Sequence, residues 1–173
     1  VLDLRANRVL VAALAGVCLG VAGAIMQTVT RTPLASPDIL GITAGASVGA
    51  VLVIAATGAD LAGRPWATAV GAMLGGLAIA LAIALLAASM DPLRMVLSGI
   101  ALGALCGALI TYVMASVDSE VAGAAVSWLA GSLEGRRPEH IWPVATALVV
   151  GLLALLPLRR AAEQLALGSA RAR

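Results

Sequence analysis

Five stretches of this 173-residue chain contain no charged residue, and they constrain its fold more than any other feature. They cover residues 9–30, 39–59, 65–90, 95–117 and 141–158. A bilayer core about 30 Å thick needs about 20 apolar residues of helix to cross it. Four of the five stretches reach that length, and the last is slightly shorter. The sequence therefore predicts an all-α fold, a polytopic membrane helix bundle with about five transmembrane helices.

The composition disfavours the other architectures. Charged residues make up 12% of the chain, about half of what a soluble domain carries. Aromatic residues are 2% and Phe is absent, whereas a membrane β-barrel needs aromatic girdles and alternating strands. The first stretch is too long for a signal peptide, and four more stretches follow it. A net charge of +2 is too small to indicate nucleic acid as a partner.

The chain offers no residue set for catalysis, a metal or another cofactor. Cys18 and Cys106 stand singly in different stretches, without a neighbouring His or second Cys, and are interpreted as packing residues. No phosphate-binding loop or hydrolase motif occurs. No ionisable residue lies within a predicted span, although ion-coupled transporters usually need one there. A transporter built from this chain would therefore take its energy from another polypeptide, and the chain is not expected to be an enzyme.

Polar residues interrupt the apolar pattern most clearly at residues 31–38, where Pro33 and Pro37 bracket a short loop. Asp38 is predicted to cap the following helix, because its carboxylate can accept from free N–H groups at the positive helix end. This helix and the one predicted at residues 95–117 each carry small residues at a spacing of four, which lets helix backbones approach closely in lipid. The glycines in these two helices are Gly41, Gly45, Gly49, Gly99, Gly103 and Gly107.

The segment 118–140 is the longest polar part of the chain and is predicted to lie at the membrane surface. Residues 122–131 within it are expected to form a short helix with Val126 and Leu129 on its apolar side. Arginine bias sets the orientation weakly, at six on one side against five on the other. It puts six arginines in the cytoplasm: Arg31, Arg94, Arg159, Arg160, Arg171 and Arg173.

Over essentially its whole length the chain resembles the permease subunits of ABC importers for iron–siderophores, haem and cobalamin. The segments that carry this resemblance, in family order, are GAIMQTVTRTPLASPDILGITAGASVGAV, LSGIALGALCGALITY, VSWLAGSLEG and QLALGSARAR. Thr32 stands where the family usually has Asn.

The resemblance implies one subunit of ten helices, of which this chain would hold the equivalents of helices two to six. Such a fragment is not expected to work alone. The implied partners are a second permease subunit in a homo- or heterodimer, two cytoplasmic ATPase subunits and an outer substrate-binding protein. The implied cargo is an iron(III)-siderophore or similar metal chelate, and the implied location is the bacterial cytoplasmic membrane.

The resemblance also assigns roles to individual residues. A cytoplasmic gate would include Thr32, Leu34, Asp91, Pro92 and Leu93. Arg5 and Arg8, in the stretch RANR with Asn7 where proline is usual, would dock the binding protein, since guanidinium groups hold carboxylates in a two-pronged geometry. Residues 126–133 would line the outer vestibule. Contact with the ATPase would involve Leu165, Leu167, Gly168 and Ala170.

Two alternatives remain open from the sequence. Within the same family the cargo could be cobalamin or haem. In a different class, the chain could be a helical membrane scaffold with no transport pathway of its own. A scaffold would have no use for an outer arginine pair, and its gene would have no binding-protein or ATPase gene beside it.

Overall fold

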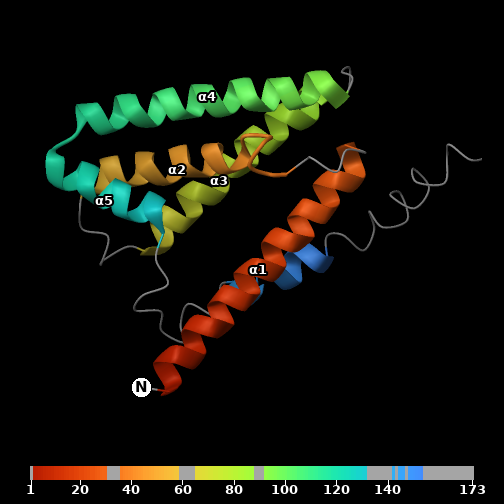
Figure 1. Ribbon diagram of the computed structural model, residues 1–173. Coiled ribbons are helices and arrows are strands. Elements are labelled where there is room, and N and C mark those ends of the chain that lie inside the picture. The colour runs from red at the N-terminus through yellow and green to blue at the C-terminus, as the bar shows by residue number, and fades with distance from the viewer. Residues whose placement is uncertain are drawn as a thin grey trace, which may run out of the picture. The chain divides into compact units, whose positions relative to one another are not determined.

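A computed structural model describes the backbone of residues 2–30, 36–58, 65–87, 92–131, 142, 144–146 and 148–153. Its helices are α1 (Leu2–Thr30), α2 (Ile42–Thr57), α3 (Pro65–Ala87), α4 (Pro92–Ser116) and α5 (Ser119–Ala130) (Figure 1). A further apolar helical segment covers Val144–Leu153. The described residues contain no strand, which agrees with the predicted all-α fold.

The chain divides into two compact units, which are described separately. One combines Val1–Val29 with Leu133–Arg173 and contains α1. The other, Thr30–Ser132, contains α2 to α5. The close helix contacts made by glycines lie in this second unit.

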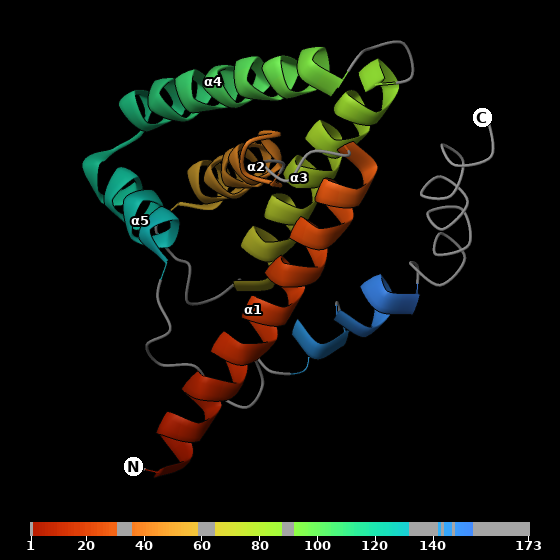
Figure 2. The same cartoon turned by 45° about the vertical axis from the view of Figure 1, so that its right-hand side comes forward.

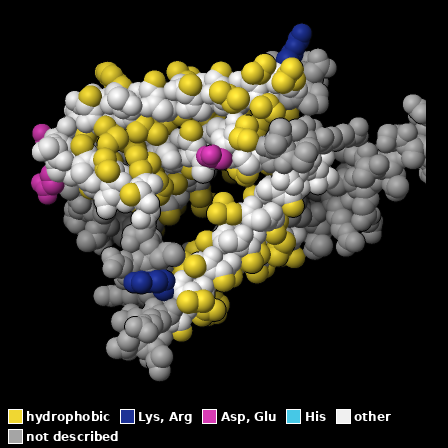
Figure 3. Space-filling model, in the orientation of Figure 1, with side chains coloured by type: hydrophobic (Ala, Val, Ile, Leu, Met, Phe, Trp, Pro, Cys, Tyr) yellow, Lys and Arg dark blue, Asp and Glu magenta, His cyan; other side chains and the backbone are white. Residues whose placement is uncertain are grey.

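Three of the described helices are long and apolar enough to cross a membrane. They are Ala6–Thr28 in α1, Trp66–Leu86 in α3 and Leu93–Ser116 in α4, and each lies within or close to a charge-free stretch of the sequence. The helices in the other two stretches, Ile42–Thr57 and Val144–Leu153, are shorter. Hydrophobic side chains cover much of the visible described surface (Figure 3), and large ones such as Leu77, Leu85 and Leu105 are 65–70% exposed. Such a surface suits lipid or other membrane helices as its surroundings.

Helix α2 is the centre of the second unit and contacts α3, α4 and α5 (Figures 1 and 2). Its buried residues are small or branched: Gly45, Ala50, Val51 and Ile54. Val51 and Ile54 form a cluster with Ala125 of α5, surrounded by half-buried side chains of α4 and α5.

The short helix predicted at residues 122–131 exists, but it begins earlier and buries a different face. α5 begins at Ser119 after Asp118, whose backbone is extended. Ala125 is 2% exposed and Val121 and Ala124 pack against the same cluster, whereas Val126 is 52% exposed. The predicted apolar side with Val126 and Leu129 was therefore wrong, because Val121, Ala124 and Ala125 face the cluster instead.

Candidate functional site

The polar break that precedes α2 folds into a hydrogen-bonded turn over residues 36–41. The Leu40 N–H donates to the Ser36 carbonyl at 3.2 Å, and the Gly41 N–H donates to the Asp38 carbonyl at 2.9 Å. The Ile39 N–H donates to the Ser36 hydroxyl at 3.2 Å. The turn thus pairs several of its backbone groups within the chain itself.

Asp38 does not cap α2, so that prediction was wrong. The residue before the helix is Gly41, and no side chain bonds to the free N–H groups there. The Ile42 N–H is already paired with the Pro37 carbonyl at 3.0 Å. The carboxylate of Asp38 instead accepts from the Thr43 hydroxyl at 2.8 Å. The extra turn separates Asp38 from the helix it was expected to begin.

Gly41 joins the turn to the helix in a left-handed conformation, with φ 73°. A Cβ at this position would lie 2.8 Å from the carbonyl oxygen of Gly99 and 3.0 Å from the backbone nitrogen of Gly103, both in α4. Leu40 beside it is fully buried. A glycine is required here twice over, for its backbone conformation and for the closeness of α4.

Gly45 and Gly49 face α3 and not α4. A Cβ at Gly49 would meet the carbonyl oxygen of Gly71, and a Cβ at Gly45 would lie 2.8 Å from the carbonyl oxygen of Gly75. The contact is reciprocal, since a Cβ at Gly71 would lie 2.7 Å from the carbonyl oxygen of Gly49. The backbones of α2 and α3 therefore touch at a four-glycine crossing made by Gly45, Gly49, Gly71 and Gly75.

The six glycines expected to pack helices thus have three different surroundings. Gly41, Gly99 and Gly103 meet where the turn touches α4, whereas Gly45 and Gly49 belong to the crossing with α3. Gly107 has no described atom within 4 Å of its Cβ position. Sequence reasoning missed Gly71 and Gly75, although their spacing of four is the same signal.

Most residues assigned to the gate lie outside the described part of the chain. These are Thr32, Leu34 and Asp91, and the four coupling residues Leu165, Leu167, Gly168 and Ala170 lie outside it as well. Pro92 and Leu93 begin α4, where a proline fits the first helical turn, and Leu93 is 70% exposed.

The two arginines assigned to docking lie in the first turns of α1. The backbone at Arg5 is helical, and the side chain of Arg8, one turn further on, is exposed. An exposed guanidinium is free to meet an acidic group of another protein. No group of three or more metal-ligating side chains occurs among the described residues. The described glycine contacts build a close-packed frame of α2, α3 and α4.

Comparison with known proteins places this frame among membrane permeases. The profile of the FecCD transport family matches residues 1–173. The ferric enterobactin transport system permease protein of Escherichia coli K12 is 41% identical over 171 residues, which are 98% of this chain and 51% of that protein. The Fe(3+)-citrate import system permease protein of Bacillus subtilis 168 is 39% identical over 155 residues, covering 89% of this chain and 44% of that protein.

More distant matches extend the same pattern. The vitamin B12 import system permease protein of Salmonella paratyphi A is 32% identical over 172 residues, or 99% of this chain and 52% of that protein. A metal-chelate type ABC transporter solved in an inward-facing conformation matches with a TM-score of 0.79 and 26% identity, over 94% of this chain and 51% of that one. The chain therefore spans about half the length of these three relatives.

Proposed function

Because the chain belongs to the FecCD transport family, we propose that it is part of the membrane-spanning permease of an ATP-driven importer for an iron(III) chelate. The observation that carries this proposal is the family match over every residue of the chain. The fold supports it, since the chain matches a metal-chelate type ABC transporter over 94% of its length. In this role the chain is a transport subunit and not an enzyme.

The cargo is proposed from the names of the relatives. Those named for ferric enterobactin, Fe(3+)-citrate and iron(3+)-hydroxamate are 41%, 39% and 36% identical to this chain. The relative named for vitamin B12 is 32% identical. An iron(III) chelate is therefore the first proposal, and cobalamin is the second candidate from the same family. The iron would be cargo inside its chelator and not a resident cofactor.

The partners follow from the chemistry that the chain lacks. No phosphate-binding loop occurs in its sequence, so ATP hydrolysis would belong to cytoplasmic ATPase subunits. A second permease subunit and an outer substrate-binding protein would complete the importer in the cytoplasmic membrane. Arg5 and Arg8 would meet acidic residues of the binding protein, and Leu165, Leu167, Gly168 and Ala170 would begin the contact with the ATPase.

The gate is proposed at two connections, one that precedes α2 and one that leads into α4. Thr32 and Leu34 would narrow the pathway ahead of the turn at residues 36–41, and Asp91, Pro92 and Leu93 would do so at the start of α4. The turn at residues 36–41 supports this proposal. It follows the first connection and contacts Gly99 and Gly103 of α4, the helix that follows the second connection.

The test is uptake by cells that lack the full-length gene. Loss of radioactive iron uptake from at least one ferric chelate, restored by the gene on a plasmid, is the expected result. Loss of labelled cobalamin uptake with unchanged iron uptake would move the proposal to the second cargo. Normal uptake of all these compounds, with no ATPase or binding-protein gene nearby, would favour a helical scaffold and overturn the transport role.

A further inference from the structure

Helix α2 begins well inside the ends of its neighbours. Its first residue, Ile42, lies beside Gly76 of α3, where the Ile42 carbonyl oxygen is 3.5 Å from the Cβ position of the glycine. α3 continues from Gly76 to Ala87, a further distance of about 16 Å at 1.5 Å per residue. In Figures 1 and 2, α3 and α4 both extend past the start of α2.

The turn ahead of α2 is recessed by a similar measure against α4. The Leu40 Cα lies 2.7 Å and the Ile39 carbonyl oxygen 3.1 Å from the Cβ position of Gly99. Gly99 follows Pro92, the first residue of α4, by about 10 Å along the helix axis. Measured along α3 and along α4, the turn therefore lies about 10 Å or more inside the ends of these two helices.

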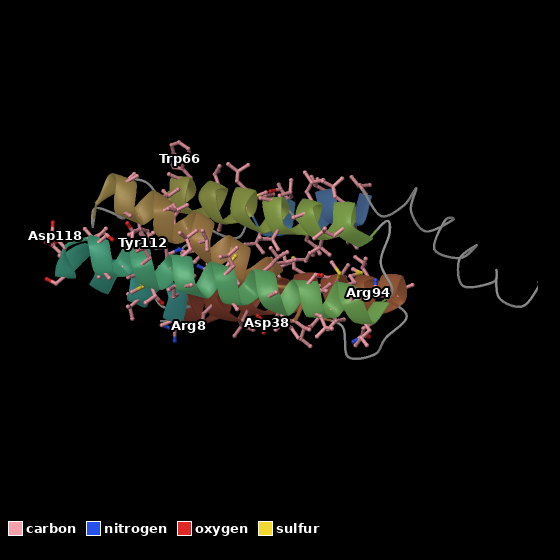
Figure 4. All side chains as sticks on the ribbon, turned by 90° about the horizontal axis from the view of Figure 1, so that it is seen from above. Arg8, Asp38, Trp66, Arg94, Tyr112 and Asp118 are labelled. Carbon is pink, nitrogen blue, oxygen red and sulfur yellow. The ribbon has the colours of Figure 1, made fainter. Side chains whose placement is uncertain are left out.

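Asp38 is part of this recessed turn, so in a membrane-spanning bundle its carboxylate would lie about 10 Å inside the ends of α3 and α4. Figure 4 shows it between Arg94 and Tyr112 along α4, on the side of the unit opposite Trp66. Figure 3 shows an acidic patch part-way along the apolar surface, apart from the acidic groups at its end. The Asp38 side chain is exposed and accepts a hydrogen bond from the Thr43 hydroxyl at 2.8 Å.

A charged side chain at this depth is expensive in lipid, and in membrane proteins such groups face a water-filled cavity or the bundle interior. One hydroxyl donor leaves most of the acceptor capacity of a carboxylate for water. We propose that Asp38 faces a water-filled recess about 10 Å inside the membrane, and that its negative charge draws cations into this recess and repels anions. This inference rests on the proposed function in two respects only. The proposed function identifies the recess as part of the transport pathway, and it places the opening of the recess on the cytoplasmic side.

The recess gives the transporter a charge-selecting residue on its inner side. Walls of low dielectric concentrate the field of a fixed charge, so one carboxylate there acts more strongly than one at the surface. The carboxylate would disfavour anionic cargo relative to neutral and cationic cargo, so among iron(III) chelates it would favour those without a net negative charge. An apparently simple membrane turn thus becomes a determinant of which chelates the pathway favours.

The test measures thiol reactivity in the full-length transporter, in a background without other cysteines, with Thr43→Cys as the reporter beside Asp38. Membrane-impermeant methanethiosulfonates are used, one cationic (trimethylammonioethyl) and one anionic (sulfonatoethyl), each added from either side of sealed vesicles. The proposal expects reaction from the cytoplasmic side. For each thiol, the rate with the cationic reagent is divided by the rate with the anionic reagent. The proposal expects this ratio at Thr43→Cys to be about tenfold higher than for a free thiol in solution, because a focused negative charge attracts cations.

Two further variants decide the interpretation. Adding Asp38→Asn to the reporter should bring the preference close to that of the free thiol while reaction continues. Leu81→Cys, an exposed position of α3 about 9 Å before its end, is the control for depth and should react slowly with both reagents. A silent Thr43→Cys, an equally reactive Leu81→Cys, or an unchanged preference with Asp38→Asn would each overturn the proposal. Because labelling needs no transported cargo, a failure of the import assay would leave these readings intact and would be recognised separately.

Discussion

Replacing Gly75 with alanine tests whether the four-glycine crossing holds α2 and α3 together. The new methyl group would meet the carbonyl oxygen of Gly45 and lie 3.0 Å from the backbone nitrogen of Gly49. Both are backbone atoms of α2 and cannot rotate away, so the helices must separate. Overpacking of this kind costs about 2 kcal/mol, or roughly thirtyfold in the unfolding equilibrium.

Gly76→Ala is the matched control, one residue further along the same helix. Its methyl group would lie 3.5 Å from the Cβ of Ala46, an ordinary contact. Both variants gain the same intrinsic helix propensity, about 1 kcal/mol in water, so their difference reports the crossing alone. The measurement is reversible unfolding of the purified full-length transporter in mixed micelles, followed by tryptophan fluorescence. Equal stability of the two variants would refute the close crossing.

Two further predictions address the turn and the outer arginines. Gly41→Ala should destabilise the protein by about 1–3 kcal/mol more than Gly107→Ala, because Gly41 has a positive φ and touches α4, whereas Gly107 has no described atom within 4 Å of its Cβ position. The same unfolding assay checks this, and equal losses would argue against the tight site at Gly41. Arg5→Glu combined with Arg8→Glu should abolish the ATPase stimulation that the binding protein produces in the reconstituted complex, because the reversed charges would repel acidic partners. Unchanged stimulation would end the docking role.

The sequence predicted the helices best where hydrophobic length alone decides the outcome. The charge-free stretches at residues 9–30, 65–90 and 95–117 each hold a helix long enough to span. Charge patterning succeeds there because lipid excludes unpaired charge and leaves the backbone only helical bonding.

The same signal failed at the start of α2. Ile39 and Leu40 are as apolar as the helix that follows, so hydropathy extended the helix to include them. The chain instead makes a turn in which Leu40 is fully buried and its Cα lies close to Gly99 of α4. Burial without regular helix depends on a neighbour far away in the sequence, and no local pattern shows it.

The candidate site was predicted unevenly for a similar reason. The spacing of the glycines indicated close packing, but it could not indicate that Gly41 faces α4 while Gly45 faces α3. The recessed position of the Asp38 turn relative to the ends of α3 and α4 was missed entirely, since its neighbours in sequence resemble a surface loop. The gate residues Thr32, Leu34 and Asp91 stay predictions from resemblance, outside the described residues.

The shortness of α2 has a consequence for how the protein is made. Its 16 residues reach about 24 Å, less than the roughly 30 Å of the hydrocarbon core. Alone in the bilayer, such a segment would leave the paired turn ahead of it without a protein neighbour. We therefore expect α2 to be stable in the membrane only once both α3 and α4 have been synthesised, because α3 packs on Gly45 and Gly49 and α4 covers the turn at Gly41.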